Sequence, residues 1–416
     1  MSAVAFTGNR GVQLMFCEVC SGEYGSLILD LGFHPLCDDL IPIGLAESAP
    51  KFQQLISLCP VCLTAHQVKP VEKELLFKPT YHYRAGLTND VLKGMNSLVA
   101  DLGKELNQVA GLATVLDVGC NDGSLLGLFK EAYSCKTIGV DPTDAINEAG
   151  SKIDFKFHEY FSASTVRKIQ SLHTKIDLIT FTNVFAHIED LPSLLNNVKD
   201  LIGPETTLVI ENHYLGAILE GSQFDTFYHE HPRTYSARSF EYVARALDLV
   251  ITEMSFPARY GGNIRVTMKK SGVPADLTGQ KNKEASFIEE FASLQDSYNN
   301  WRSDAKQELA QLSERALIYG KALPGRAVML INALNIDSEI MPIVFEQPAS
   351  PKVGHYVPSS KIEILSDSLI HSHLPEVLVV WSWHIIDEIV SYLDLLGYRG
   401  EIWVPLPKFR MYRPSL

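Results

Sequence analysis

Apolar positions in the middle of the chain fall into short runs rich in β-branched residues, and these runs alternate with segments of helical periodicity. Runs that are apolar on both faces are typical of strands at the centre of a parallel sheet. Two later runs follow each other without a helix and predict an antiparallel pair that closes the sheet. The alternation therefore predicts an α/β domain built from βαβ units. The runs are TVLDVG (114–119), KTIGVD (136–141), IDLITFTN (176–183) and TTLVIENH (206–213), with the closing pair LVITEMSFPA (249–258) and NIRVTMKK (263–270).

A long helix and a second set of apolar runs follow this domain. Apolar side chains recur three or four positions apart between residues 283 and 317, which predicts an amphipathic helix whose stripe packs on the core. We therefore predict an α/β protein in three parts, residues 1–75, 76–275 and 276–416, of which the last holds the long helix and a second βαβ series. The runs of that series are RALIYG (315–320), AVMLIN (327–332), MPIVFE (341–346), VLVVWSW (377–383) and EIWVPLP (401–407).

Length and charge narrow the functional classes. At 416 residues the chain is longer than one hydrophobic core supports. Its net charge of -13 argues against a broad nucleic-acid surface, and it has no run of about 18 apolar residues that could span a bilayer. The N-terminal residues lack a basic segment followed by an apolar one, so no signal peptide is predicted. We expect a cytoplasmic protein, a monomer or weak oligomer, that binds neither nucleic acid nor a membrane.

Four of the 7 cysteines form two C-x2-C pairs, CEVC and CPVC. Two thiolates at this spacing can hold one face of a tetrahedral zinc ion, and the second pair completes a four-thiolate site. Disulfide pairing fits poorly in a reducing compartment. Four thiolates leave no open coordination position, so a structural zinc is predicted. The predicted ligands are Cys17, Cys20, Cys59 and Cys62, whereas Cys37 is interpreted as a buried thiol that only fills space.

The segment VLDVGCNDGSLL combines a strand, a tight glycine turn and a helix, the geometry that presents backbone amides to a cofactor. It lacks the G-x-G-x-x-G spacing of a dinucleotide site. An acid two places before the first glycine would repel a pyrophosphate but suits an amino-acid ammonium group, and an acid at the end of the next strand can accept both ribose hydroxyls. The pattern favours S-adenosylmethionine over NAD. The predicted cofactor-binding residues are Asp117, Gly119, Asn121, Gly123 and Asp141.

This block, with FTNVFAHIEDL further along, resembles class I methyltransferases. The resemblance narrows when CPVCLTAHQV, LDLGFHPLCDDL, YHEH, YGGNIRV and the second, Rossmann-like half are added in the same order. Together they resemble the S-adenosylmethionine-dependent C-methyltransferases of nucleotide-linked 4-keto-6-deoxy sugars, which carry a four-cysteine zinc module. The resemblance implies methylation of a carbon next to the ketone through an enolate. Carbon 3 is favoured over carbon 5 as the more frequent case, and the product is a branched sugar.

In that family the YHEH segment lies in the sugar pocket, which implies roles for the matching residues here. Enolate formation requires a base for the carbon proton and a donor for the developing oxyanion. We predict His231 as the base, Glu230 as the group that orients or tunes an imidazole, and Tyr228 as the oxyanion donor or a partner in the base role. His187 either completes a proton relay or caps the following helix, and His229 is interpreted as a solvated loop residue.

Other candidate residues depend on the resemblance alone. The second half departs from the family pattern in YGKALPGRA, in the glutamate that ends MPIVFE and in the histidine of WSWHIIDEI. These changes fall where the nucleotide is expected, so the nucleotide, the sugar and the methylated carbon stay open. Asn183 and Tyr83 are predicted to contact the cofactor, and the predicted substrate-binding residues are Arg233, Asn263, Arg265 and Lys352.

Three alternatives remain at this stage. One is an O- or N-methyltransferase acting on another small molecule. Another is a zinc-bearing binding protein without activity, which the intact turn and strand-end acid argue against. The least favoured is a DNA-binding zinc protein, because no basic stripe follows the cysteines.

Overall fold

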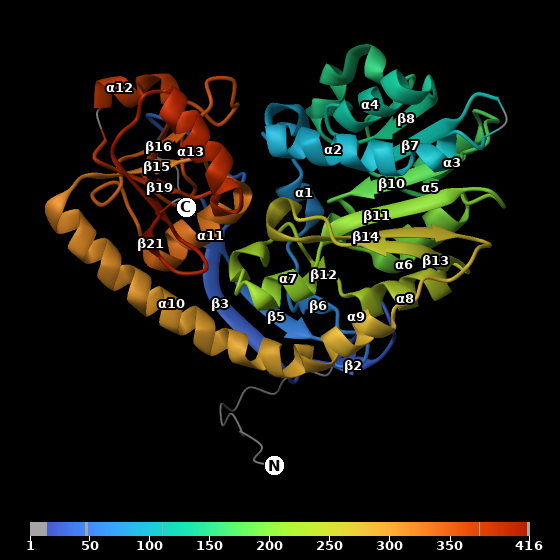
Figure 1. Cartoon of the computed structure of the whole chain (residues 1–416), viewed down its shortest axis with the longest axis horizontal. Coiled ribbons are helices and arrows are strands. Elements are labelled where there is room, and N and C mark those ends of the chain that lie inside the picture. The colour runs from blue at the N-terminus through green and yellow to red at the C-terminus, as the bar shows by residue number, and fades with distance from the viewer. Residues whose placement is uncertain (1–14, 46–48, 110, 374, 414–416) are drawn as a thin grey trace.

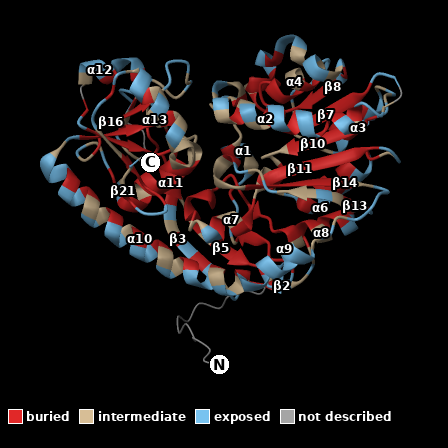
Figure 2. Ribbon diagram, viewed as in Figure 1, coloured by how far each residue is buried: buried red, intermediate tan, exposed pale blue. Residues whose placement is uncertain are grey.

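The computed structural model describes residues 15–45, 49–109, 111–373 and 375–413. The interpretation that the N-terminus lacks a signal peptide concerns residues outside this part. Two α/β units lie side by side, with the N-terminal strands below and between them, and the helix α10 runs along the lower edge from one unit to the other (Figure 1). Buried residues fill the sheets of both units, and exposed residues gather on the outer faces of the helices (Figure 2). In the described ranges, no helix has the length and apolar character needed to cross a membrane.

The central unit is a seven-stranded sheet with the order β13-β14-β11-β10-β7-β8-β9. Its strands from β11 to β9 are parallel, and β13 and β14 close it as the predicted antiparallel pair. Strand β7 is buried at every position, because helices cover both faces. The strands are β7 (Thr114–Val118), β8 (Lys136–Val140), β9 (Phe155–Phe157), β10 (Leu178–Thr182), β11 (Thr207–His213), β13 (Val250–Ser255) and β14 (Asn263–Lys269).

The helices around this sheet begin where the sequence supplies caps. Serine capping boxes at Ser162 and Ser236 start α5 and α8 by satisfying free backbone N–H groups. The helices of this half are α1 (Lys73–Leu76), α2 (Asn89–Asp101), α3 (Gly103–Leu106), α4 (Ser124–Tyr133), α5 (Ala163–Gln170), α6 (Leu191–Lys199), α7 (Leu215–Glu220) and α8 (Ala237–Ala246).

The N-terminal strands connect the two units. A four-stranded sheet with the order β12-β6-β5-β3 is antiparallel, and β12 comes from the segment directly after YHEH. Strand β4 instead joins the edge of the C-terminal sheet by pairing with β17. The strands are β1 (Met15–Phe16), β2 (Glu23–Tyr24), β3 (Ile28–Pro35), β4 (Ile41–Pro42), β5 (Lys51–Leu58), β6 (Ala65–Gln67) and β12 (Arg233–Thr234).

The C-terminal unit is an eight-stranded sheet with the order β21-β20-β19-β15-β16-β18-β17-β4. The predicted amphipathic helix is confirmed as α10, which buries the apolar stripe. The run AVMLIN, grouped with the strand runs of the second βαβ series, instead forms most of the helix α11 and is buried on nearly every side. A short, fully buried apolar run does not by itself distinguish a helix from a strand. The elements are α9 (Thr278–Lys283), α10 (Phe287–Arg315), β15 (Ile318–Lys321), α11 (Gly325–Leu334), β16 (Ile343–Glu346), β17 (His355–Tyr356), β18 (Glu363–Ser366), α12 (Ile370–His373), β19 (Val377–Val380), α13 (Ile386–Leu395), β20 (Glu401–Val404) and β21 (Arg410–Met411).

Candidate active site

A cavity of about 1140 Å³ is lined by residues from all three parts of the chain. The N-terminal part contributes Cys37, the central sheet contributes the glycine turn and the YHEH loop, and the C-terminal unit contributes Lys321 and Lys352. A single small-molecule pocket has a volume of roughly 300–1,000 Å³. The cavity therefore has room for two ligands.

The turn between β7 and α4 is built for close approach to a ligand. Gly119, Asn121 and Gly123 all have positive φ, of 74°, 49° and 71°, a region in which glycine and asparagine are tolerated best. A Cβ atom on Gly119 would lie 2.1 Å from Cγ2 of Val184, so only glycine fits. The Asn121 amide donates to the carbonyl of Tyr83 (3.1 Å), which holds the linker over the turn.

Two buried acids define the cofactor end of the cavity. Asp117 accepts a hydrogen bond from the Thr180 hydroxyl (2.7 Å), and burial raises its pKa to about 7. Asp141 directly follows β8 and accepts from the N–H groups of Asn121 (2.9 Å) and Thr143 (2.8 Å). The Thr143 hydroxyl also donates to Asp141 (2.6 Å). Three of about four acceptor positions of this carboxylate are therefore taken, which leaves capacity for one ribose hydroxyl. The glycine cradle and the two acids fit S-adenosylmethionine better than a pyrophosphate.

Of three further residues predicted to bind the cofactor, two line the cavity and one does not. Asn183 lines the cavity and accepts from the Asn263 amide (3.2 Å). Tyr83 lines it too, with its hydroxyl 3.3 Å from that of Tyr260. Gly123 instead lies at the start of α4, where an added Cβ would meet Ala149 Cβ at 2.9 Å, so its role is packing of the turn.

The YHEH loop brings aromatic and imidazole rings together in the cavity. The His231 ring centroid lies 4.9 Å from that of His187, 4.9 Å from that of His213 and 4.3 Å from that of Tyr228. His187 does not cap helix α6, whose N-cap is Asp190. Its ring stacks on Phe77 and faces the cavity, as a relay position requires.

The hydrogen bond of His231 determines which of its nitrogens is free. Nδ1 lies 2.8 Å from the carbonyl oxygen of Thr226. Because a carbonyl can only accept, Nδ1 carries the hydrogen and Nε2 carries the lone pair. Burial lowers the pKa of His231 to about 4, so the ring is neutral at pH 7. A neutral imidazole with a free Nε2 can accept a proton.

Glu230 has partners other than the predicted imidazole. Its Oε1 accepts from the thiol of Cys37 (2.7 Å) and its Oε2 accepts from the hydroxyl of Tyr81 (2.8 Å). The interpretation of Cys37 as filler is therefore wrong, because its thiol lines the cavity and holds a carboxyl group. Burial raises the pKa of Glu230 to about 7.

The interpretation of His229 as a solvated residue is also wrong. Its side chain is buried, and Nε2 lies 3.3 Å from the carbonyl oxygen of Phe52 on β5. Its ring packs edge-on against the Phe52 ring. Neighbouring histidines of one loop thus point in different directions, His229 into the N-terminal sheet and His231 into the cavity.

Of the predicted substrate-binding residues, Lys352 lines the cavity, where Nζ donates to the Leu323 carbonyl (2.6 Å). Arg233, Asn263 and Arg265 are buried outside the lining, which corrects the prediction. Arg233 pairs with Glu18 and donates to the Glu189 carbonyl (2.7 Å) because β12 turns its side chain toward the N-terminal part. Asn263 and Arg265 lie on β14 and hold Glu211, at 3.0 and 2.7 Å.

Several lining residues were not predicted from the sequence. His213 is the last residue of β11, and its position at the carboxyl end of a parallel strand was the signal available. Tyr260 and His384 face the same region, with ring centroids 6.3 Å apart. Arg326 follows Pro324 and Gly325 in YGKALPGRA, a segment that departs from the family pattern.

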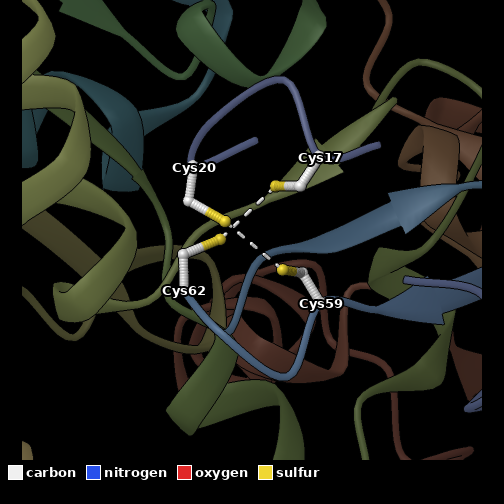
Figure 3. Close-up of side chains that lie close together, drawn as sticks. All are labelled: Cys17, Cys20, Cys59 and Cys62. Atoms are coloured by element: carbon white, nitrogen blue, oxygen red, sulfur yellow. Dashed lines mark hydrogen bonds between the residues drawn. The ribbon is translucent and has the colours of Figure 1, made fainter. Parts of the chain in front are cut away.

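The four cysteines of the two C-x2-C pairs come together outside the cavity. Their sulfur atoms all lie within 4.8 Å of one another, with Cys17 3.5 Å from Cys62 and Cys20 3.6 Å from Cys59. The side chains point toward a common centre (Figure 3). Zinc bonded to four sulfurs at about 2.3 Å places neighbouring sulfurs about 3.8 Å apart. The donor set and its spacing therefore fit a tetrahedral metal ion.

Comparisons with known proteins agree with this geometry. A family model described as a methyltransferase domain matches residues 88–254, and one described as a C-methyltransferase C-terminal domain matches residues 258–407. The C-methyltransferase NovU of Streptomyces niveus is 24% identical over 411 residues, which cover 95% of this chain and 96% of that protein. The chain belongs to the S-adenosylmethionine-dependent C-methyltransferases.

Solved structures give only weak overall likenesses to this C-methyltransferase. The magnesium protoporphyrin IX methyltransferase of Synechocystis PCC 6803 is 15% identical, with a TM-score of 0.32 over 44% of this chain and 80% of that one. The CurJ carbon methyltransferase is 13% identical, with a TM-score of 0.35 over 48% of this chain and 62% of that one. At such TM-scores neither likeness bears on the substrate.

Asp141→Asn in the C-methyltransferase is expected to weaken binding of S-adenosylhomocysteine at least tenfold. The variant keeps the shape of the side chain but loses charge-assisted hydrogen bonds, worth about 1.5–3 kcal/mol. Titration calorimetry measures the change in Kd. Asp144→Asn is the matched control, since that carboxylate lies nearby but is 50% exposed and outside the cavity lining. Equal Kd values for the two variants would place the ribose elsewhere.

Glu230→Gln is expected to stabilise the C-methyltransferase relative to the parent protein as the pH rises from 5 to 8. The pKa of Glu230 is raised by burial to about 7 in the folded state. Its contribution to stability is therefore present below the ordinary pKa of about 4.3 and is lost as the pH rises through 7. Between these two pKa values, the free energy of unfolding of the parent falls relative to that of Glu230→Gln by about 1.4 kcal/mol per pH unit.

Urea unfolding at several pH values measures this difference in the free energy of unfolding. Glu148→Gln serves as the control, because the Glu148 side chain is 56% exposed. A gap between Glu230→Gln and the parent that does not change with pH would show that Glu230 is ionised throughout.

Proposed function

We propose that this C-methyltransferase methylates a carbon next to the ketone of a nucleotide-linked 4-keto-6-deoxy sugar, at carbon 3, in the cytoplasmic synthesis of branched sugars. The observation that carries the proposal is the neutral His231, whose free Nε2 lies beside a phenol in a cavity with room for two ligands. Methylation at oxygen or nitrogen requires no such base for a carbon-bound proton. A keto sugar requires both the base and the oxyanion donor.

The residues of the loop suit the two halves of this chemistry. Nε2 of His231 accepts the proton from the carbon next to the ketone, which leaves that carbon nucleophilic. Tyr228 donates to the developing oxyanion, since burial raises its pKa well above its ordinary value and keeps the phenol protonated. S-adenosylmethionine supplies an electrophilic methyl group when bound. His187, neutral because burial lowers its pKa, flanks His231 and would pass the proton on to solvent rather than hold it.

The nucleotide end of the substrate is proposed to lie against the C-terminal unit. Helix α11 begins at Gly325, which lines the cavity, and free N–H groups at a helix start favour a phosphate. Lys321 and Lys352 add positive charge to the same wall, although Lys321 is paired with Asp367 at 2.8 Å. A nucleoside diphosphate fits this combination.

The four-cysteine cluster is proposed to hold one structural zinc ion. Its two C-x2-C pairs supply four sulfur donors and no open position for chemistry. The backbone carbonyl of Cys62 accepts from the hydroxyls of Ser236 (3.0 Å) and Ser239 (3.1 Å), so the metal would fix the N-terminal part onto the start of α8.

Incubation with labelled S-adenosylmethionine and a panel of dTDP-, GDP- and CDP-linked 4-keto-6-deoxy sugars tests the substrate proposal. Label is expected on one of these sugars. With S-adenosylhomocysteine in place of the methyl donor, that sugar should exchange the proton next to its ketone with deuterated water. Methyl transfer to a heteroatom acceptor without this exchange would replace the proposal with an O- or N-methyltransferase.

A further inference from the structure

We infer that Arg326, in the C-terminal unit, is a positioning residue that sets the hydrogen-bonded form of His231 in the central unit. The inference rests on the proposed role of His231 as the base. The hydrogen bonds of Arg326 reach His231 indirectly. Thr226 joins the two residues, because its hydroxyl accepts from Arg326 and its carbonyl accepts from His231.

The guanidinium of Arg326 is buried and bonds almost entirely to the segment before YHEH. Nε and Nη2 form a two-pronged pair with the Asp225 carboxylate, at 2.8 and 2.7 Å. Nη2 also donates to the hydroxyl of Thr226 (2.7 Å), and Nη1 donates to the carbonyl of Tyr260 (2.9 Å). With a further bond from Nη2 to Oε1 of Gln223 (3.3 Å), five hydrogen bonds run from this one side chain of α11 to the central unit.

Thr226 passes this constraint to the base. Its hydroxyl is held by Arg326, and its carbonyl oxygen accepts from Nδ1 of His231 at 2.8 Å. The second hydrogen bond is the one that leaves the lone pair on Nε2, the atom that faces a substrate proton. If the carbonyl turned away, the hydrogen could move to Nε2 and the imidazole would lose its ability to accept there.

Only an arginine can form this arrangement. Its planar group presents several donors in a fixed fork, whereas lysine offers a single point charge. The Trp383 ring stacks under the guanidinium, 4.9 Å from its carbon, and the indole N–H donates to Asp225 (3.0 Å). The pair is closed off from water, since Asp225 is fully buried. The docking of the C-terminal unit and the state of the base are therefore linked.

Arg326 also acts on His231 through its charge. Burial lowers the pKa of His231 most, the bond to Thr226 raises it in part, and the nearby Arg326 charge lowers it by a smaller amount. The other titratable groups that face His231 are the neutral His187 and His213 and the protonated Tyr228. Loss of Arg326 has opposite effects on the pKa of His231, because the lost charge raises it and a lost bond to Thr226 lowers it. The position of the ring hydrogen is therefore the property that reports the link.

Side-chain nitrogen NMR of the full-length protein tests the inference without a substrate. The His231 signal is identified by its loss in His231→Asn. In the parent protein we expect a single form with the hydrogen on Nδ1 that titrates near pH 4. In Arg326→Gln we expect a mixture of both neutral forms.

Two further variants make the result decisive. Arg326→Gln combined with Asp225→Asn removes the pair without leaving a buried unpaired charge, which guards against misfolding, and it should show the same change of form. Arg302→Gln is the matched control, because that arginine donates to the Ala333 carbonyl from α10, outside the cavity lining. An unchanged His231 signal in the folded double variant would overturn the inference. Normal turnover of His231→Asn would instead overturn the proposed base and leave the link between Arg326 and His231 standing.

Discussion

Cys59→Ser is expected to abolish metal binding and to unfold the N-terminal sheet. A structural zinc site contributes roughly 10–16 kcal/mol to folding, because the binding site does not exist in the unfolded chain. Cys17 and Cys20 lie between β1 and β2, which form a separate two-stranded sheet and are each only two residues long. Without the metal, a two-stranded sheet of this length is not stable by itself, and the connection from Cys59 to Cys62 between β5 and β6 loses its anchor.

The loss should spread to the active site through one strand. Strand β12 pairs with β6 and directly follows the YHEH loop, so the loop depends on the N-terminal sheet for its position. The carbonyl of Phe227 also accepts from the Gln54 amide on β5, at 2.9 Å. Turnover should therefore fall together with the metal content.

Elemental analysis of the purified protein and limited proteolysis measure the two effects. One zinc per chain and a protected N-terminal part are expected for the parent, and no zinc with cleavage before about residue 75 for Cys59→Ser. Cys135→Ser is the control, because Cys135 is also buried but belongs to no cluster of metal ligands among the described residues. A parent protein that is folded and active without metal would contradict the prediction.

The central sheet could be predicted because each of its inner strands is buried on both faces and leaves an unbroken apolar run. The long helix could be predicted for a similar reason, since its buried stripe has helical period. The pairings of β12 with β6 and of β4 with β17 could not, because strands of two or three residues carry no pattern and their partners lie far away in the sequence.

In the candidate site, too, contacts between residues close in sequence could be predicted, and contacts between distant residues could not. The cofactor turn and Asp141 are close in sequence and follow strand ends, so their proximity could be predicted. The partners of Glu230 could not, because Cys37 and Tyr81 come from other parts of the chain. The directions of His229 and His231 depend on the pairing of β12 that follows them, which no local pattern reveals.

His231→Asn is expected to lower turnover by roughly 100- to 10,000-fold, the contribution of a positioned base. Binding of S-adenosylhomocysteine should change little, because His231 lies with His187 and His213 rather than with the glycine turn. The variant should also lose exchange of the sugar proton with deuterated water. The pH dependence adds a second test: the base form of His231 exists above about pH 4, so kcat/KM of the parent should fall as the pH drops through that value.

His229→Asn is the matched control for this prediction, since it changes a buried histidine two positions away that contacts β5 instead of the cavity. It should lower the melting temperature but keep proton exchange in the folded protein.

Two outcomes would assign the base to another residue. If kcat/KM falls as the pH drops through 7, and this fall is absent in Glu230→Gln, the base is Glu230, whose pKa is raised by burial to about 7. If His231→Asn keeps exchange while Tyr228→Phe abolishes it, the base is the phenol. Burial raises the pKa of Tyr228 well above its ordinary value, so a phenolate base would need another group to accept the phenol proton. Glu230, whose carboxylate accepts from Tyr81 and Cys37, is the acceptor in this loop to test first.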